Sequence, residues 1–283
     1  MSTATASIQP GAAHPHTSLG RLRFDRIVRS EWIKLRTLRS TFWTLVGVVV
    51  LIIGLPALIS AVVPSLSVIE SRAPASQLTA FTTNTATAGL TFAQLVVGVL
   101  GVLVISGEFS TGMIRSSFAA VPRRFPVFAA KAIVLFLTSF IIGLVSFAAS
   151  WSIAVPLLTA KGYAGDLFSS NTLWNIVGAA AYLGLVSIFA LGIGAIVKST
   201  AGGISTALGV LFVLPIVAAL LTSLLPKQTW IADASAYLLS AAGSGMAGLA
   251  NHSLEPWANV VTVLVWAAVS FVIGALLLQR RDA

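Results

Sequence analysis

One internal stretch, residues 107–131 (GEFSTGMIRSSFAAVPRRFPVFAAK), combines a carboxylate with several cations and is the candidate site of this chain. Its charged residues are one carboxylate and four cations: Glu108, Arg115, Arg123, Arg124 and Lys131. Residues 73–107 before it and 132–160 after its last lysine contain no Lys, Arg, Asp or Glu. A positively charged link between two membrane-length apolar segments should lie on the cytoplasmic side, because short loops rich in Lys and Arg are retained there. We therefore expect a cytoplasmic partner to bind here.

Catalysis is not expected of this chain. An intramembrane enzyme needs ionisable or nucleophilic groups at membrane depth, and the long apolar segments carry none outside their end turns. The GIGAIVKST sequence at 192–200 resembles a phosphate-binding loop, but Val197 occupies the position of the required second glycine. The chain has no cysteine, which excludes disulfides and thiolate sites. We predict no catalytic, cofactor or metal site on this chain.

Composition places these residues in a membrane protein. The chain is 57% hydrophobic and 9% charged, with a mean hydropathy of +0.96, whereas soluble proteins are about 25% charged. Segments 95–106 and 261–278 are apolar on every face, unlike the alternating strands of a barrel. The sequence therefore predicts an all-α polytopic membrane protein, with its basic residues at membrane edges and no nucleic-acid partner.

Six apolar segments are long enough to cross a hydrocarbon core about 30 Å thick, which takes about 20 helical residues. The predicted spans are 42–63, 88–106, 127–150, 174–197, 202–224 and 257–278. Residues 64–87 and 159–172 are expected to form outer loops, and a tight inner turn is expected around Lys198. Residues 1–20 are rich in Ser, Thr, Ala and Pro and are expected to form a disordered tail ahead of a transmembrane domain over 21–283.

Residues 21–40 predict a basic amphipathic helix lying flat at the membrane interface. One side of a helical wheel carries Phe24, Ile27, Val28, Trp32, Leu35 and Leu38; the other carries Arg26, Arg29, Ser30, Arg36 and Thr37. Glu31 projects close to the apolar side, so it either pairs with Lys34 one turn on or docks onto stretch 107–131 or a partner chain. The basic residues alone could instead serve only to keep the N-terminus inside.

Charge asymmetry predicts the orientation. With the N-terminus inside, 14 of the 17 Lys and Arg residues lie in inner segments, and only Arg72, Lys161 and Lys227 lie in outer ones. The eight acidic residues divide evenly between the two sides. This is the positive-inside pattern, and it predicts six spans in the cell membrane with both termini cytoplasmic.

Residues 234–254 do not fit this scheme as a seventh span. They are uncharged and long enough, but they are rich in Gly, Ser and Ala, and a crossing here would place Arg280 and Arg281 outside. We expect short helices that dip into the outer leaflet, or a re-entrant hairpin. Small residues also recur four apart, as in Ser205/Gly209 and Ser270/Gly274, which favours close helix packing within the chain or between subunits.

Together these patterns resemble the permease subunit of an ABC-2-type ABC exporter, over residues 21–281. SEWIKLRTLRSTFWTL at 30–45 is similar to that family's interfacial helix and first span, and the 107–131 stretch is similar to its cytoplasmic link. The Gly-rich segment before the last span is similar to the family's outer re-entrant element. The link departs from the family in one place, with Thr111, Gly112 and Met113 where Gly-Thr-Ile or Gly-Thr-Leu is common.

The resemblance implies a motor on another chain. Two copies of an ATP-binding cassette subunit, which bind ATP and Mg, would press on a coupling helix over 107–124 in each of two permeases, forming a homodimer or heterodimer. The implied coupling residues are Glu108, Phe109, Gly112, Met113, Ile114, Arg115, Phe118, Arg123 and Arg124. The apolar members recur at three- and four-residue spacing, which suits a partner's groove or, alternatively, lipid headgroups. The residues implied on the interfacial helix are Phe24, Val28, Glu31, Trp32, Lys34, Leu35 and Arg36.

The function that the resemblance implies is export of an amphipathic, lipid-like or drug-like cargo by alternating access. The absence of charges at membrane depth suits such cargo better than small ions. The alternative is a six-helix membrane channel or assembly scaffold that works without a motor.

Overall fold

The computed structural model describes residues 23–66, 74–110, 124–164, 170–249 and 254–280, and within these ranges every regular element is a helix. Six helical segments of the described chain are long and apolar enough to cross a membrane, which confirms the predicted number and is consistent with a multi-pass membrane protein. The predicted tail over residues 1–20 lies outside the described residues. The elements are α1 (Phe24–Thr37), α2 (Arg39–Val62), α3 (Ala75–Thr87), α4 (Leu90–Ser110), α6 (Arg124–Thr159), α7 (Ser170–Val197), α8 (Thr200–Leu208), the π-helix η2 (Gly209–Val213), α9 (Leu214–Leu224), α10 (Thr229–Ala236), α11 (Leu239–Met246) and α12 (Pro256–Arg280).

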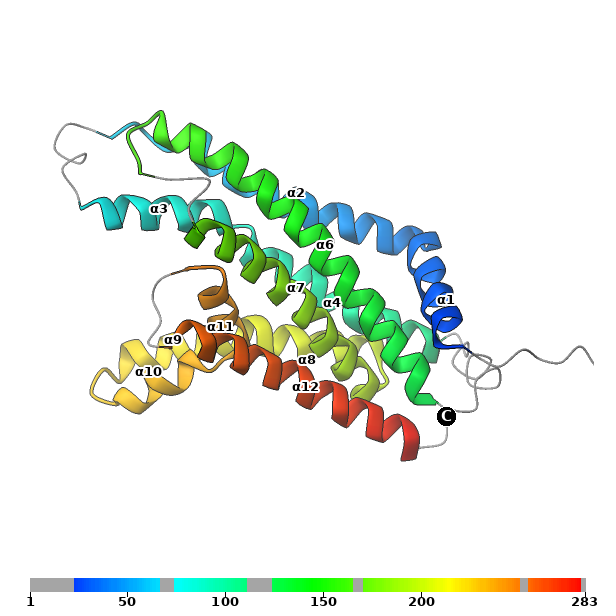
Figure 1. Ribbon diagram of the computed structural model, residues 1–283. Helices are drawn as coiled ribbons and strands as arrows, with labels where there is room; N and C mark the ends of the chain where they lie inside the picture. Colours follow the sequence, from blue (N-terminus) through cyan, green and yellow to red (C-terminus); the bar gives the residue numbers. More distant parts are fainter. Residues whose placement is uncertain (1–22, 67–73, 111–123, 165–169, 250–253, 281–283) are drawn as a thin grey trace, which may run out of the picture.

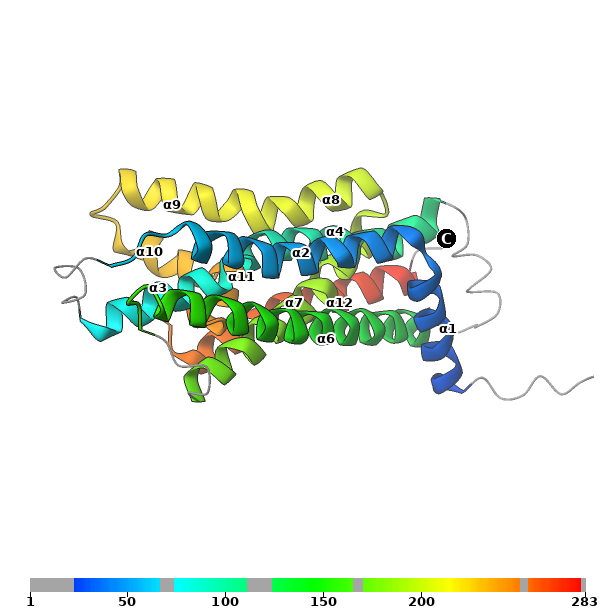
Figure 2. The ribbon, with the colours of Figure 1, turned by 90° about the horizontal axis from the view of Figure 1, so that it is seen from above.

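The long helices run side by side, and α1 lies across them at one end of the bundle (Figures 1 and 2). We call this the α1 end, and the opposite end, where α9 leads into α10, the α10 end. Helix α7 is central and packs against α4, α6 and α12. In its most apolar part 72% of the residues are buried, against 11% for the α8–η2–α9 segment. The core therefore forms around α7, and the α8–η2–α9 segment lies at the periphery.

Exposed tryptophans lie near both ends of the bundle. Trp43 lies near the start of α2 at the α1 end, whereas Trp174, Trp230 and Trp257 lie in α7, α10 and α12 towards the α10 end; each is more than 60% exposed. Tryptophan concentrates where hydrocarbon meets headgroups. The two groups are separated by the apolar lengths of the helices, as expected of a chain with a bilayer between its ends.

Helix α3 corrects the prediction of an outer loop over residues 64–87. Its threonines made the segment look too polar for a helix, but Thr79, Thr83 and Thr87 donate their hydroxyls to carbonyls one turn earlier. Thr82 also donates to the carbonyl of Ala164 at 2.7 Å. With the hydroxyls satisfied, the helix packs against α6 and extends the second span.

Lys161 fastens the end of α2 to the loop after α6. Its ammonium donates to three carbonyls at the C-terminus of α2: those of Ser60 at 2.8 Å, Ala61 at 2.8 Å and Val63 at 2.6 Å. The last carbonyls of a helix have no partner within it, and a cation there is stabilising. Lys161 is therefore a cap that joins two elements about a hundred residues apart in sequence.

Residues 234–249, the described part of the Gly-rich segment, do not cross the bundle, because α9 ends and α12 begins at the same end (Figure 1). Helix α11 instead packs against α7 and α12. A Cβ on Gly243 would overlap the ring of Tyr182, and one on Gly178 would overlap the carbonyl of Met246. The glycines are therefore needed for close backbone approach.

The two small-residue pairs have different surroundings. A Cβ on Gly192 of α7 would lie 2.5 Å from the backbone carbonyl of Ser270, and one on Gly274 would lie 3.1 Å from the carbonyl of Gly192. The pair on α12 therefore serves packing within the chain. The Cβ position of Gly209, in contrast, has no contact within 4 Å beyond its chain neighbours and the backbone of its own helix.

Candidate functional site

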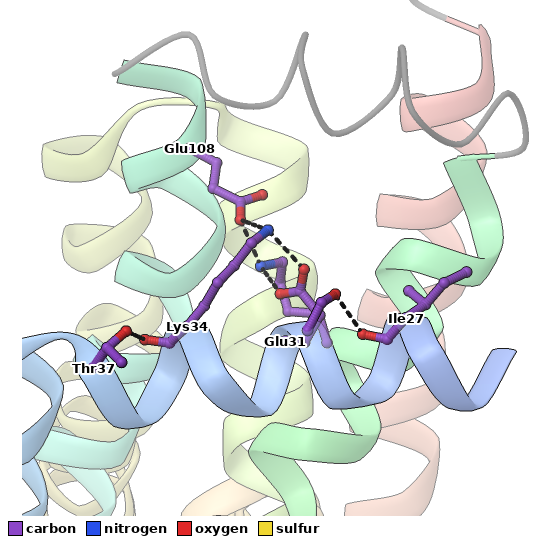
Figure 3. Close-up of polar contacts among 7 residues, drawn as sticks. Ile27, Glu31, Lys34, Thr37 and Glu108 are labelled. Atoms are coloured by element: carbon purple, nitrogen blue, oxygen red, sulfur yellow. Dashed lines mark hydrogen bonds and ion pairs between the residues drawn. The ribbon is translucent and has the colours of Figure 1, made fainter. Parts of the chain in front are cut away.

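Four charged side chains from three helices meet at the α1 end, and Figure 3 labels three of them, Glu31, Lys34 and Glu108. They are Glu31 and Lys34 of α1, Glu108 in the last turn of α4, and Lys131 in the second turn of α6; we call them the charged cluster. The Lys131 ammonium donates to Glu31 Oε2 at 2.6 Å and to Glu108 Oε1 at 2.9 Å. The Lys34 ammonium donates to Glu31 Oε1 at 2.8 Å and to Glu108 Oε1 at 3.3 Å. Each cation thus bridges both carboxylates.

The charged cluster is neutral in sum and largely removed from water. Lys131, Glu31 and Glu108 are 3%, 5% and 9% exposed, and only the Lys34 side chain is about one-third exposed. Burying single charges is costly, and the cost is offset only where opposite charges and hydrogen bonds meet them with good geometry. The bonds to Lys131 meet that condition, so α1, α4 and α6 are held to one another at this point.

The electrostatics favour the ionised forms of Glu31 and Lys34. Burial alone would raise the pKa of the Glu31 carboxyl, but the Lys131 and Lys34 ammonium groups outweigh it and hold that pKa below its ordinary value. For Lys34, burial opposes the charged form, yet Glu31 and Glu108 raise its pKa above the ordinary value. At neutral pH the interactions of Glu31 and Lys34 are therefore those of a carboxylate with an ammonium.

The sequence of α1 explains why a carboxylate is buried there. Ile27, Glu31 and Leu35 follow one another at four-residue spacing and are the buried residues of this helix. Ile27 packs in a cluster with Val127 and Ala130 of α6, and Leu35 packs in another that also contains residues of α4 and α6. Apolar contacts thus hold both sides of Glu31 against the bundle, where its side chain is 5% exposed.

Both alternatives raised for Glu31 occur together, since it pairs with Lys34 and also with Lys131 of the 107–131 stretch. The side chains on the predicted apolar side of α1 differ in their exposure. Phe24 and Trp32, placed on the apolar side with Leu35, are each 45% exposed, Val28 is half-buried and Arg36 is exposed. The helix therefore has a narrow buried face, beside which two aromatic side chains remain uncovered by the rest of the described chain.

The predicted coupling helix over 107–124 is described only at its two ends. Glu108 and Phe109 lie in the last turn of α4, and Arg124 begins α6. The remaining predicted residues lie outside the described part of the chain: Gly112, Met113, Ile114, Arg115, Phe118 and Arg123. Phe109 packs partly against the core cluster that contains Leu35. Its ring also lies 5.4 Å from the ammonium of Lys198, in the turn between α7 and α8.

Lys198 and Lys131 are two cations at this site whose roles were not predicted. Lys198 has a backbone φ of 56°, the one positive φ among the described non-glycine residues. Lys131 had a recognisable signal: like Glu31, it lies on an apolar helical face, between Val127 and Leu135. Two opposite charges on two otherwise apolar faces predict that those faces pack together.

The charged cluster also borders a cavity of about 490 Å³ between α1, α4 and α6. Apart from the cluster, its wall is largely apolar and includes Leu38, Leu103 and Val134. No group of three or more His, Cys, Asp or Glu side chains that could hold a metal occurs among the described residues. The arrangement offers mechanical connection, because a displacement of the end of α4 would be passed through Lys131 and Lys34 to α6 and α1.

Comparison of this sequence with protein-family models and with curated proteins finds no match. The resemblance to ABC-2-type permeases is therefore developed below as a proposal, on the geometry of the charged cluster.

Proposed function

We propose that this chain is the membrane-spanning permease subunit of an ATP-driven exporter of the ABC-2 type. The observation that carries the proposal is where the charged cluster sits. Glu108 lies three residues before the 111–123 link and Lys131 lies eight residues after it, and both bond to Glu31 or Lys34 of α1. A force applied to the link would reach three helices at once through this cluster.

The apolar lengths of the helices support the membrane part of the proposal. Most described basic residues lie at the α1 end, including Arg26, Arg29, Arg39 and Lys198, whereas Lys161 and Lys227 lie towards the other end. An excess of Lys and Arg on one side favours that side as the cytoplasmic one. We therefore propose a cell-membrane location with the α1 end and both termini inside.

The proposed mechanism uses the connection between the link and the spans. ATP and Mg would bind to two copies of a separate cassette subunit, which would act on the 111–123 links of two permease copies. Because α4 and α6 are rigid helices whose ends join the link, its displacement would tilt them together, with α1 carried along by Glu31. Alternating access needs movements of this kind, in which packed helices switch between two arrangements.

The test is to purify the tagged chain from its native membranes in a mild detergent. We expect an ATP-binding cassette protein to co-purify, and ATP hydrolysis by the complex. The matched variant replaces the apolar link residues Met113, Ile114 and Phe118 by serine; it should lose the cassette protein while the permease still inserts. Purification of a folded permease with no nucleotide-binding partner would refute the exporter proposal and would favour the channel or scaffold.

A further inference from the structure

A second cavity of about 480 Å³ lies between α4, the η2–α9 segment and α11. Its wall combines two kinds of side chain. Five polar residues line it: Asn84, Thr91, Gln94, Ser240 and Ser244. Opposite them, Leu211, Phe212 and Ile216 contribute apolar surface, and among the described residues no Asp, Glu, Lys, Arg or His lines the cavity. The described wall is therefore uncharged and amphipathic.

The cavity exists because the fifth span separates from α4 at its midpoint. A Cβ on Gly98 of α4 would lie 2.9 Å from Leu211 Cδ1, so the two segments touch at η2. Helix α8 packs against α4 before this point, whereas α9 beyond it has no buried residue. Pro215, the second residue of α9, also lines the cavity. The cavity is the space between α4 and α9, and α11 forms its remaining wall.

Gln94, one of the polar residues of this site, lies within the apolar length of α4. Gln94 precedes Glu108 by 14 residues on α4, which at about 1.5 Å per residue is roughly 21 Å along the helix. A hydrocarbon core that begins near the charged cluster extends about 30 Å. Gln94 would thus lie inside it, where an unsatisfied polar group is costly. Polar side chains at that depth suit a polar ligand.

Gln94 is held in one orientation from behind. The hydroxyl of the fully buried Tyr182 donates to Gln94 Oε1. This bond directs the amide oxygen towards Tyr182, and the end left for the cavity is the NH₂ group, which has two donors and no acceptor. The Ser244 hydroxyl donates to the Ser240 carbonyl at 2.9 Å, so its remaining capacity towards the cavity is as an acceptor. The Gln94 NH₂ group is therefore the donor in the cavity wall whose orientation is fixed by a hydrogen bond, the one from Tyr182 to the amide oxygen.

We propose that this cavity binds a neutral amphipathic molecule whose headgroup presents an ester carbonyl oxygen to the Gln94 amide, with its alkyl part against Phe212 and Ile216. A charged headgroup would lose its hydration here without gaining a counter-ion, which disfavours it strongly. The role of this molecule as exported cargo rests on the proposed function; its binding does not. Bilayer lipids carry the same ester carbonyls, so the test must separate the two sources.

The binding test uses the full chain with a single cysteine added, free of its partners. The chain is placed in nanodiscs of ether-linked phosphatidylcholine, which lacks carbonyl groups. The probes share one alkyl chain: monodecanoylglycerol, decanoate and decyltrimethylammonium. The chain has no cysteine, so Ala241→Cys in the cavity wall can report occupancy by protection from a maleimide. Ala219→Cys, on an exposed position of α9 outside the cavity, is the control. We expect only monodecanoylglycerol to protect, and only at position 241.

The role of the amide is tested by Gln94→Leu. Loss of one neutral hydrogen bond should weaken protection by monodecanoylglycerol about three- to tenfold. Tyr182→Phe should also weaken it by freeing the amide, whereas Thr206→Val, whose hydroxyl bonds its own helix, should not. Equal protection by the three probes, or unchanged affinity in Gln94→Leu, would overturn the proposal. If Gln94→Leu does not insert, the thermal stability of the wild-type chain is measured with each probe instead. Stabilisation by monodecanoylglycerol alone would support the proposal, and equal stabilisation by the three probes would contradict it.

The outcomes separate this inference from the exporter proposal. Binding without a cassette partner would leave the site standing and remove its role in ATP-driven export. A cassette partner without binding would retain the exporter and remove this site. Repeating the assay in ester-linked phosphatidylcholine identifies the source: weaker apparent probe affinity there would show that bilayer lipids compete for the same cavity.

Discussion

Lys131→Met is the most direct test of the charged cluster. The substitution keeps most of the side-chain volume but leaves Glu31 and Glu108 buried, with only the half-buried Lys34 between them. The two lost bonds are short, at 2.6 and 2.9 Å, and the Lys131 side chain is 4% exposed. Removing one partner of a buried ion pair costs about 3–5 kcal/mol. We expect a loss in this range, because the remaining lysine cannot neutralise two carboxylates.

The assay is reversible unfolding in mixed micelles with increasing dodecyl sulfate, followed by circular dichroism. Lys227→Met, at an exposed position outside the cluster, is the matched control and should stay within about 0.5 kcal/mol of the wild type. The double variant Glu31→Gln/Lys131→Met should lose less than the sum of the single changes, because it removes one of the uncompensated charges. A loss below about 1 kcal/mol for Lys131→Met, with additive single effects, would refute a buried, mutually dependent cluster.

Three further changes test other parts of the structure. Because the folded pKa of Glu31 is below its ordinary value, the stabilisation that its carboxylate provides is complete above about pH 4.3 and is lost as the pH falls through the lower folded pKa. The free energy of unfolding of Glu31→Gln should therefore depend less steeply on pH in that range. Identical slopes for the variant and the wild type would contradict the assignment. Gly243→Ala should cost about 1–3 kcal/mol by overlap with Tyr182, whereas Gly209→Ala, which faces open space, should cost less than about 0.5 kcal/mol in the same assay. Lys161→Met removes the cation that caps α2 and should weaken that helix end by up to about 1 kcal/mol, seen as faster amide hydrogen exchange there; unchanged exchange would show that the cap is dispensable.

The six spans could be predicted because each is an uncharged run of sufficient length, and hydrophobicity alone decides where a chain can cross a bilayer. Helix α3 could not, since its threonines are polar in composition yet satisfied by their own backbone once helical. The π-helix η2 was equally hidden, because its residues GVLFV are as apolar as any α-helical stretch. Local composition does not encode where a helix takes an extra residue into one turn.

The candidate site was predictable in part. The position of Glu31 beside an apolar stripe indicated that it needed a partner, and the 107–131 stretch was among the partners considered. The specific bond to Lys131 needed the packing of α1 on α6, which depends on Ile27 meeting Val127 and Ala130. The depth of Gln94 was recognisable from the sequence as a polar residue in an apolar run. Its contact with Tyr182, 88 residues away, was not.

The π-helix also affects how the outer part of the fifth span can move. An α-helix advances about 100° per residue, so gaining or losing the one extra residue of η2 would rotate α9 about its own axis by roughly that amount. Helix α9 buries none of its side chains, and such a rotation would break few packing contacts. Helix α9 can thus turn about its own axis at η2, and such a rotation would present different side chains to the cavity beside α4.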